Sequence, residues 1–230
     1  GRETNQDIFR DEYSFANLTG SLGLFRNITN KTTIRINIGT AWRTPNMAEL
    51  YSFGQHGYKV SYGLLRYYTN DEGKLKTDQV IKMNASKVKP EKGVKWINEF
   101  KTHKKKDSYT LTAYAHYIQN FIYNRPITVT GTIRGPMPAF IYDQSDAAFL
   151  GTDFTWQRSW SKSLQGTFGL SYLWSRNVEK NEQLINQPPI TTNYKLTLQT
   201  KKILKLKTSK LIAKGSYTFK QYNAPKTITP

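Results

Sequence analysis

The residues of this chain whose types could support chemistry gather between positions 43 and 91. Arg43 and Glu49 carry opposite charges on either side of Pro45. Proline cannot donate a hydrogen bond to a β-ladder, so it ends a strand naturally. We therefore expect Arg43 and Glu49 to pair and to anchor a loop where it leaves a strand. This structural role is favoured over direct ligand binding.

His56 is the sharpest candidate for ligand chemistry, because neutral imidazole is a common ligand of iron. The alternative is an ordinary exposed histidine on a loop. The other two histidines, His103 and His116, are too scattered along the chain to predict a zinc site. We therefore predict no metal site built from histidine clusters.

A run of tyrosines with one arginine follows His56. Such side chains stack on ligands, and they also pack on one another to stiffen a long loop. The sequence leaves both alternatives open. The run consists of Tyr58, Tyr62, Arg66, Tyr67 and Tyr68. The acidic residues at 70–73 lack the spacing of a calcium loop and predict a turn.

The sequence does not predict an enzyme or a resident cofactor. It contains no cysteine, which removes thiolate metal sites and cysteine nucleophiles together. It also has no nucleophile motif, phosphate-binding loop or dinucleotide fingerprint.

The net charge of +18 raises the question of nucleic-acid binding. No nucleic-acid recognition motif accompanies the charge, and the basic residues sit mostly in turns and at strand ends, as at 104–106 and 201–210. Wetted rims near anionic lipid head groups suit that distribution. We therefore predict no nucleic-acid partner.

The elements that position these residues are predicted by an alternation of period two. In 34–40, Ile34, Ile36 and Ile38 share one face, and Arg35 and Asn37 share the other. Similar segments predict about eight strands, most of them near the ~9–11 residues that cross a bilayer. They lie at 16–24, 34–40, 93–102, 108–123, 147–158, 164–174, 194–200 and 211–219.

Connection lengths alternate along the chain. The short connections are 27–31, 102–107, 159–163 and 204–209, and the long ones are 43–92, 125–140 and 178–190. Outer-membrane barrels have short turns on one side and long loops on the other. The sorting favours an all-β, antiparallel transmembrane β-barrel over a soluble β-sandwich.

The segment 41–57 resembles the TonB-dependent outer-membrane receptors. Arg43, Pro45, Glu49 and Tyr51 match an Arg-x-Pro-x-x-x-Glu-Leu-Tyr run that opens a large extracellular loop in that family.

A second match lies where that family's loop closes. Pro90 and Glu91 fit the closing Asn-Pro-x-Leu-x-Pro-Glu stretch, in which Ala85 replaces the usual proline. The segments 111–123 and 147–154 resemble strands that follow in the family, so the resemblance spans roughly 13–223.

The resemblance implies a barrel of about twenty-two strands closed by an N-terminal plug. Residues 1–230 would be a fragment of one such barrel domain, with the plug and the final strands absent. The polar face of the strands is expected to line the lumen. It carries Arg35, Asn37, Thr110, Thr112, Lys195 and Gln199.

The resemblance also implies a receptor in the outer membrane of a Gram-negative bacterium. It would take up a ferric siderophore, haem, cobalamin or a glycan with energy from the TonB complex, which would act through the missing plug. Its other partners would be outer-membrane lipid and the small extracellular ligand. Haem receptors of this family carry a histidine in this loop, so His56 is a possible haem ligand. The alternatives are a passive porin, an adhesin-type barrel or a soluble β-rich binding module.

Overall fold

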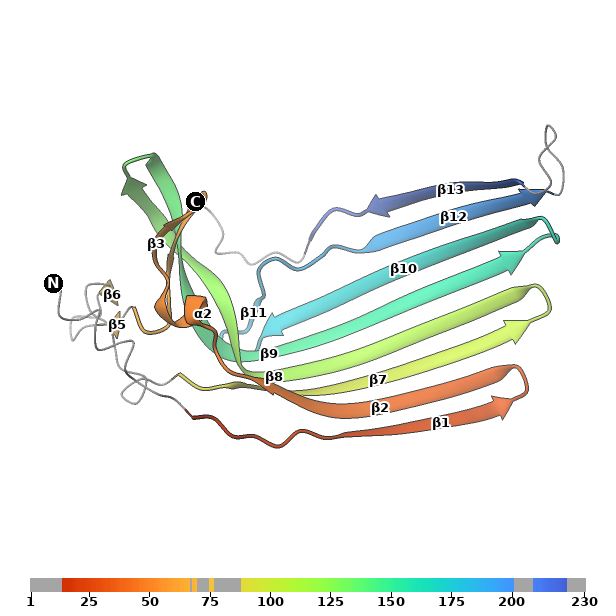
Figure 1. The fold of residues 1–230 in the computed structure, drawn as a ribbon, viewed down its shortest axis with the longest axis horizontal. Coiled ribbons are helices and arrows are strands. Elements are labelled where there is room, and N and C mark those ends of the chain that lie inside the picture. The colour runs from red at the N-terminus through yellow and green to blue at the C-terminus, as the bar shows by residue number, and fades with distance from the viewer. Residues whose placement is uncertain (1–13, 67, 70–74, 77–87, 201–208, 223–230) are drawn as a thin grey trace.

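The structure is a computed structural model that describes residues 14–66, 68–69, 75–76, 88–200 and 209–222. Eight long strands follow one another across a single antiparallel sheet in the order β1-β2-β7-β8-β9-β10-β12-β13 (Figure 1). Their bounds are Ser21–Thr29, Thr32–Arg43, Glu91–Lys104, Asp107–Thr132, Gly135–Ser159, Leu164–Asn177, Thr191–Thr200 and Ser209–Thr218. The predicted all-β fold is confirmed.

The first strand differs from its prediction. Alternation favoured a strand at 16–24, but β1 begins at Ser21 and continues to Thr29. Residues 14–20 lie outside any strand, although the Gly20 carbonyl still accepts a hydrogen bond from Thr40 N at 2.9 Å. Alternation of apolar and polar residues shows only that a segment could form a strand, because a strand also needs a neighbour in register. The residues of β1 pair with β2 from Ser21 onward, so the strand begins there.

Short turns join the strands at one end of the sheet, as predicted. Asn30–Lys31, Lys105–Lys106 and residues 160–163 connect β1–β2, β7–β8 and β9–β10. Lys105 has a φ of 44°, the left-handed conformation of a tight turn. The connection predicted at 204–209 lies outside the described residues except for Ser209. Figure 1 shows the described turns gathered at the same end.

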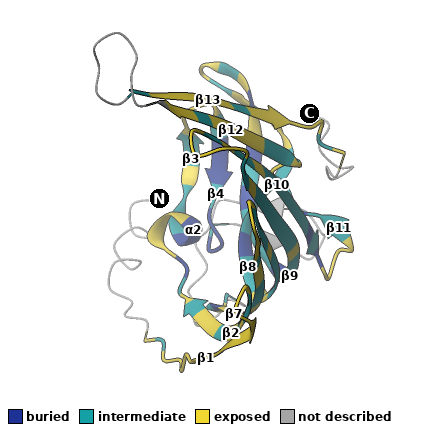
Figure 2. Ribbon diagram, turned by 90° about the vertical axis from the view of Figure 1, so that its right-hand side faces the viewer, coloured by how far each residue is buried: buried dark blue, intermediate teal, exposed yellow. Residues whose placement is uncertain are grey.

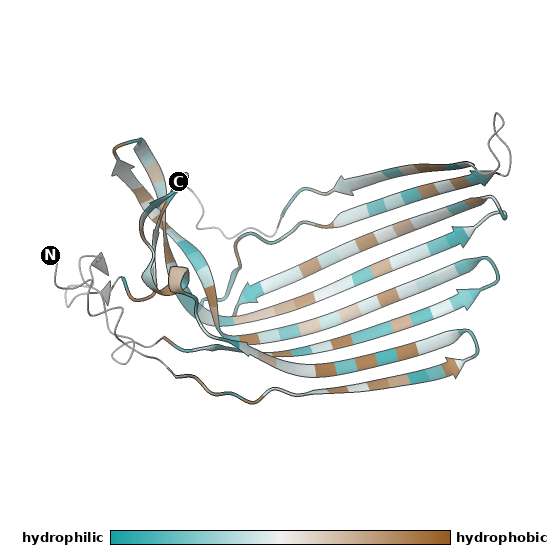
Figure 3. Ribbon diagram, viewed as in Figure 1, coloured by the Kyte–Doolittle hydropathy of each residue, from teal (hydrophilic) through white to brown (hydrophobic). Residues whose placement is uncertain are grey.

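The register of the sheet sorts its side chains onto two faces. Ile36 pairs with Leu24 and Ile38 with Trp96, whereas Arg35 pairs with Glu99. Figure 3 shows apolar and polar residues alternating along the strands. The apolar face leaves many large side chains exposed, including Leu22, Leu24, Ile38, Trp96, Phe100, Leu111, Leu150, Phe168, Leu196 and Leu211. Such a continuous apolar face is what a barrel wall presents to lipid.

The sheet is curved, and within the described residues it is open (Figure 2). In that part of the chain β1 pairs only with β2, and β13 pairs only with β12. Across the sheet, glycines accept neighbouring rings: the Tyr114 ring lies over Gly151, and the Tyr194 ring lies over Gly215. Each ring fills the space that a side chain at the glycine would otherwise occupy.

The prediction of a loop at 125–140 is wrong. Strands β8 and β9 continue through this segment as a hairpin, with 26 and 25 residues in the two strands. About 9–11 residues suffice to cross a bilayer, so the outer half of this hairpin extends beyond the wall. Thr128, Val129 and Thr130 are β-branched residues that favour strands, and Gly135 adopts a φ of 102° next to the turn. Figure 1 shows this outer half bending away from the line of the sheet.

The long connection at 43–92 is folded in its described parts. It contains the short helix α2 (Met47–Tyr51) and the hairpin of β3 (Phe53–His56) and β4 (Lys59–Tyr62), followed by β5 (Tyr68–Thr69) and β6 (Leu75–Lys76). β4 pairs in parallel with the outer half of β9, with Val60 opposite Ala139. Figure 2 shows α2, β3 and β4 on the hollow side of the curved sheet. The connection at 178–190 contains β11 (Glu182–Gln183), which pairs with β10.

The buried hydrophobic core lies at this long-loop end. One cluster joins Leu50, Leu64 and Leu65 to Ile122, and a second joins Val60, Met137 and Ala139. Burial of these side chains holds the segment 47–65 against the β8–β9 hairpin. Among the described residues, no helix is long and apolar enough to cross a membrane.

Candidate functional site

The most tightly connected group of charges joins Arg43, Glu49 and Glu91. Arg43 Nη1 and Nη2 donate to the two Glu49 oxygens at 2.8 and 2.9 Å. Arg43 Nε and Nη2 donate to the two Glu91 oxygens at 2.7 and 2.9 Å. The guanidinium therefore makes two bidentate pairs, which is the geometry that fits its planar fork best.

Local sequence and strand register explain how these three side chains meet. Pro45 follows the end of β2, and Asn46 caps α2 by accepting from Glu49 N at 2.9 Å. Glu49 Oε2 accepts from Asn46 N at 2.8 Å, which completes a capping box. Register places Glu91 opposite Arg43 across β2 and β7.

Glu91 extends this group to a third strand, because its Oε1 accepts a hydrogen bond from Ile122 N at 2.6 Å. The other predicted anchor residues lie nearby: Tyr51 packs against the Leu50 cluster, and the Pro90 carbonyl accepts from Asn120 Nδ2 at 3.3 Å. Glu49 and Glu91 are 8% and 7% exposed, so both carboxylates depend on Arg43 for compensation. The arrangement ties β2, α2, β7 and β8 together.

His56 and Tyr58 lie at the tip of the β3–β4 hairpin. His56 is the last residue of β3, and Gly57 and Tyr58 form the turn, with Gly57 at a φ of 63°. Both His56 and Tyr58 are exposed, and Tyr58 reaches 93%. These two side chains are therefore available to a ligand.

Tyr62 and Arg66 have partners within the protein. The Tyr62 ring meets the Phe53 ring edge-on, with centroids 5.9 Å apart, and Arg66 Cζ lies 5.1 Å from the centroid of Phe53. Their contacts favour the stiffening alternative over ligand stacking for these two residues. Tyr67 and the predicted turn at 70–73 lie outside the described residues. The backbone of Tyr68 pairs with Lys76 in β5–β6.

Sequence reasoning missed a second polar network on the outer part of β8, β9 and the connection after β10. Asp143 Oδ2 accepts from Arg125 Nε and from Lys180 Nζ, each at 2.8 Å. Lys180 Nζ also donates to the Tyr123 hydroxyl at 2.8 Å, as does Asn177 Nδ2 at 3.0 Å. No local signal indicates this group, because its members come from three separate segments.

A cavity of about 370 Å³ lies beside this network, lined by Tyr123, Arg125, Pro126, Ile127, Lys180 and the segment 182–185. Burial alone would raise the pKa of Asp143, but the hydrogen bonds and charges of Lys180 and Arg125 outweigh it and hold that pKa below its ordinary value. Burial likewise opposes the charge of Lys180, yet its bonds to Asp143 and Tyr123 raise its pKa. Both shifts favour the charged forms of Asp143 and Lys180.

The outer half of the β8–β9 hairpin is expected to loosen in acid. A carboxylate whose pKa is lower in the folded state than in the unfolded chain stabilises the fold at any pH above its pKa in the unfolded chain. This stabilisation is lost as the pH falls through its pKa in the folded state. Replacing Lys180 by methionine should remove about 1 kcal/mol of this stabilisation and move the loosening to higher pH. Hydrogen exchange of 121–145 in the full receptor, followed from about pH 6 to about pH 3, measures the pH at which the hairpin loosens. Lys162→Met, in an exposed turn at the opposite end, is the control, and coinciding profiles for both variants would contradict the expectation.

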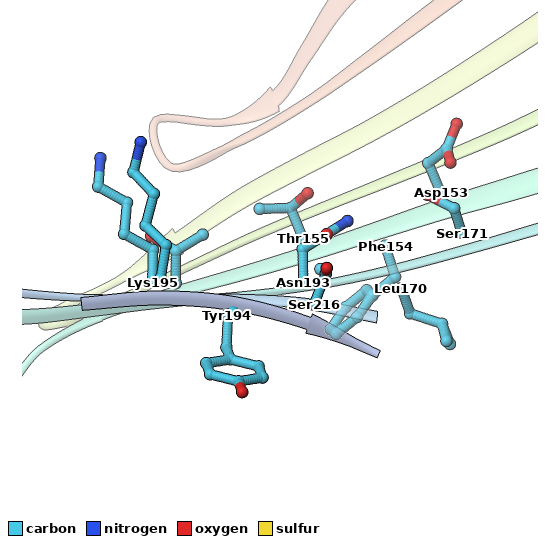
Figure 4. Close-up of a pocket in the computed structure, with 13 residues that line it drawn as sticks. Asp153, Phe154, Thr155, Leu170, Ser171, Asn193, Tyr194, Lys195 and Ser216 are labelled. Atoms are coloured by element: carbon cyan, nitrogen blue, oxygen red, sulfur yellow. The ribbon is translucent and has the colours of Figure 1, made fainter. Parts of the chain in front are cut away.

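The polar face forms a hollow of about 580 Å³ over β9, β10, β12 and β13. Figure 4 shows Thr155, Asn193 and Lys195 on one side of the sheet and Tyr194 on the other. Gly169 lacks a side chain there and leaves part of the hollow open. The residues predicted for the lumen lie on this same face of the sheet. The described residues contain no cluster of three or more potential metal ligands.

The two-faced curved sheet, with short turns at one end and folded loops at the other, defines the wall of a transmembrane β-barrel of the outer-membrane type. A family model described as TonB dependent receptor-like, beta-barrel, matches residues 1–226. The chain therefore belongs to the TonB-dependent receptor β-barrel family. Barrels of this family sit in the outer membrane of Gram-negative bacteria.

Solved structures support the same fold. The copper transporter OprC matches with a TM-score of 0.56 and 20% identity, covering 78% of this chain and 24% of that one. The siderophore receptor PirA from Pseudomonas aeruginosa matches with a TM-score of 0.52 and 17% identity, and the match covers 87% of this chain and 34% of PirA. The ferric enterobactin receptor PfeA from the same organism matches with a TM-score of 0.54 and 19% identity, and the match covers 80% of this chain and 26% of PfeA. Comparison with curated proteins gives no significant match. The chain thus spans a quarter to a third of these solved receptors.

Proposed function

We propose that this chain supplies part of the wall and the ligand-facing loops of an outer-membrane receptor that takes up a scarce ligand with energy from the TonB complex. The observation that carries the proposal is the folded long-loop end. There α2 and the β3–β4 hairpin pack on the hollow side of the sheet against the extended β8–β9 hairpin (Figure 2). A pre-organised outer surface of this kind suits a receptor that captures a ligand selectively better than it suits a pore for free diffusion.

The ligand belongs to the classes handled by such receptors: ferric siderophores, haem, cobalamin or glycans. The solved relatives include a copper transporter, a siderophore receptor and a receptor solved in complex with enterobactin. In the proposal the polar face of the wall, with Arg35 and Lys195, surrounds a plug that lies elsewhere in the complete receptor, and the plug connects it to the TonB complex.

Uptake by a strain that lacks the complete receptor tests this function. Growth of the deletion strain on single iron sources, cobalamin or glycans should fail for one ligand, and the full-length gene should restore it. Restoration should disappear when the TonB complex is inactivated, because uptake then lacks energy. Ligand uptake that persists without the TonB complex would instead indicate a passive porin.

If the ligand is haem, His56 is expected to coordinate its iron. The exposed position of His56 at the hairpin tip leaves its imidazole accessible. Titration of the full receptor with haemin should shift the Soret band, and His56→Ala should weaken binding by about tenfold or more, since an iron–imidazole bond is lost. The control is His103→Ala, which removes an exposed histidine at the short-turn end. Equal titrations for the two variants would remove His56 as a ligand.

A further inference from the structure

An apolar cavity opens on the lipid-facing side of the sheet close to the short turns. It measures about 260 Å³ and is lined by Trp156, Arg158, Trp160, Gly166, Thr167, Phe168, Tyr194, Lys195 and Leu196. Gly166 makes room for it, because a side-chain carbon there would lie 2.5 Å from the Trp160 ring. Tryptophan and tyrosine are the residues that prefer the membrane–water boundary, so the cavity lies at the depth where lipid chains meet head groups.

Positive charge is concentrated in the short turns at this end of the sheet. The turns described at 29–32, 103–107 and 158–163 contain Lys31, Lys104, Lys105, Lys106, Arg158 and Lys162, with Asp107 as their acidic residue. Figure 1 places these turns along one end of the sheet. The net charge of this rim is therefore strongly positive where it meets the membrane surface.

The single acid of these turns is already occupied. Asp107 Oδ1 accepts from Trp156 Nε1 at 2.9 Å and lies 3.7 Å from Arg158 Nη1. Lys106 Nζ donates only to the Trp160 carbonyl, at 3.3 Å, among the described contacts. Arg158 Nε is buried and has no hydrogen-bond partner in the described part of the chain. Arg158 lines the apolar cavity, and Lys106 contacts the carbonyl of Trp160, which also lines it. Both cations keep unused donor capacity there.

We propose that this cavity and its rim form a site for an anionic phospholipid. One acyl chain lies against Trp156, Trp160 and Leu196, and the head-group phosphate binds Lys106 and Arg158. Apolar burial and charge act on the same molecule here, whereas free phosphate would use the cations alone. The site depends on the barrel fold and not on which ligand the receptor transports.

Quenching of tryptophan fluorescence by phospholipids with brominated chains tests the site. The full receptor in mixed micelles is titrated with brominated phosphatidylglycerol and, separately, with brominated phosphatidylcholine. Wild type should bind the anionic lipid about fivefold more tightly or better, because two cations face its head group. The double variant Lys106→Gln/Arg158→Gln should bring this ratio close to one.

Three further measurements separate the parts of the proposal. Lys31→Gln/Lys101→Gln removes two cations from the β1–β2 turn and from β7, away from the cavity on β9, β10 and β12, and it should keep the preference. Gly166→Leu fills the cavity and should weaken quenching by both lipids. Inorganic phosphate at millimolar concentration should not displace the brominated anionic lipid. An unchanged lipid preference in Lys106→Gln/Arg158→Gln would overturn the proposal. If the double variant does not fold, the single variant Lys106→Gln gives the same test. Full displacement of the lipid by phosphate would also overturn the proposal.

Discussion

Replacing Arg43 by alanine is expected to destabilise the long-loop end by about 2–3 kcal/mol, less than the loss of a fully buried ion pair because the Arg43 side chain is 43% exposed. The substitution leaves Glu49 and Glu91 buried and close to each other without the guanidinium that compensates both. Uncompensated buried charge is the costly part, and the lost contact between α2, β7 and β8 adds to it. Hydrogen exchange of 46–66 in the full, membrane-embedded receptor should rise strongly, while exchange in the wall strands at 164–174 stays low.

Arg35→Ala is the matched control for this prediction. Arg35 lies on the same strand, and its Nη1 lies 3.5 Å from Glu99 Oε1, but the side chains of this pair are 54% and 33% exposed. An exposed ion pair of this kind contributes about 1 kcal/mol or less. The combined variant Arg43→Met/Glu49→Gln/Glu91→Gln should recover much of the lost protection, because it removes the buried charges together. Equal exchange in Arg43→Ala and Arg35→Ala would show that the cluster does not hold the loop.

Replacing Gly63 by alanine is expected to separate the segment after β4 from α2, at a cost of roughly 3 kcal/mol. A side-chain carbon at position 63 would collide with the backbone of Leu50 and would lie 2.6 Å from Tyr51 N. Backbone atoms cannot move aside as a flexible side chain can. The contacts at risk are Gly63 N to Ser52 O at 2.7 Å, Leu64 N to Glu49 O at 2.8 Å and Leu65 N to Leu50 O at 3.0 Å.

Limited proteolysis of the outer surface measures this effect. Gly63→Ala should expose the segment 52–66 to cleavage, because the fully buried Leu65 would be pulled from its cluster. Gly131→Ala serves as the control, since a side-chain carbon there meets nothing within 4 Å and the position is also outside the wall. Cleavage that is equally slow in both variants would mean that the segment tolerates the added carbon by shifting.

The sequence alone predicted the wall, because alternation is a local property of each strand. Ile34, Ile36 and Ile38 indicate one face without any knowledge of their neighbours, and the short turns are marked by their own polar residues. The eight strands and their sorting into two faces followed from this pattern. The same reasoning missed the outer ends of β8 and β9 at 125–140, where Thr128, Val129 and Thr130 carry no clear apolar alternation, and it began β1 too early.

The tertiary structure decided which of the candidate residues act together. Resemblance placed Arg43 and Glu49 where the long loop opens and Glu91 where it closes. The register of β2 against β7 and the hydrogen bond from Ile122 show how the three residues join several elements. The network of Tyr123, Asp143 and Lys180 had no sequence signal. The physical reason is that periodicity depends on residues two apart, whereas these contacts depend on strand pairing and packing between segments far apart in the chain.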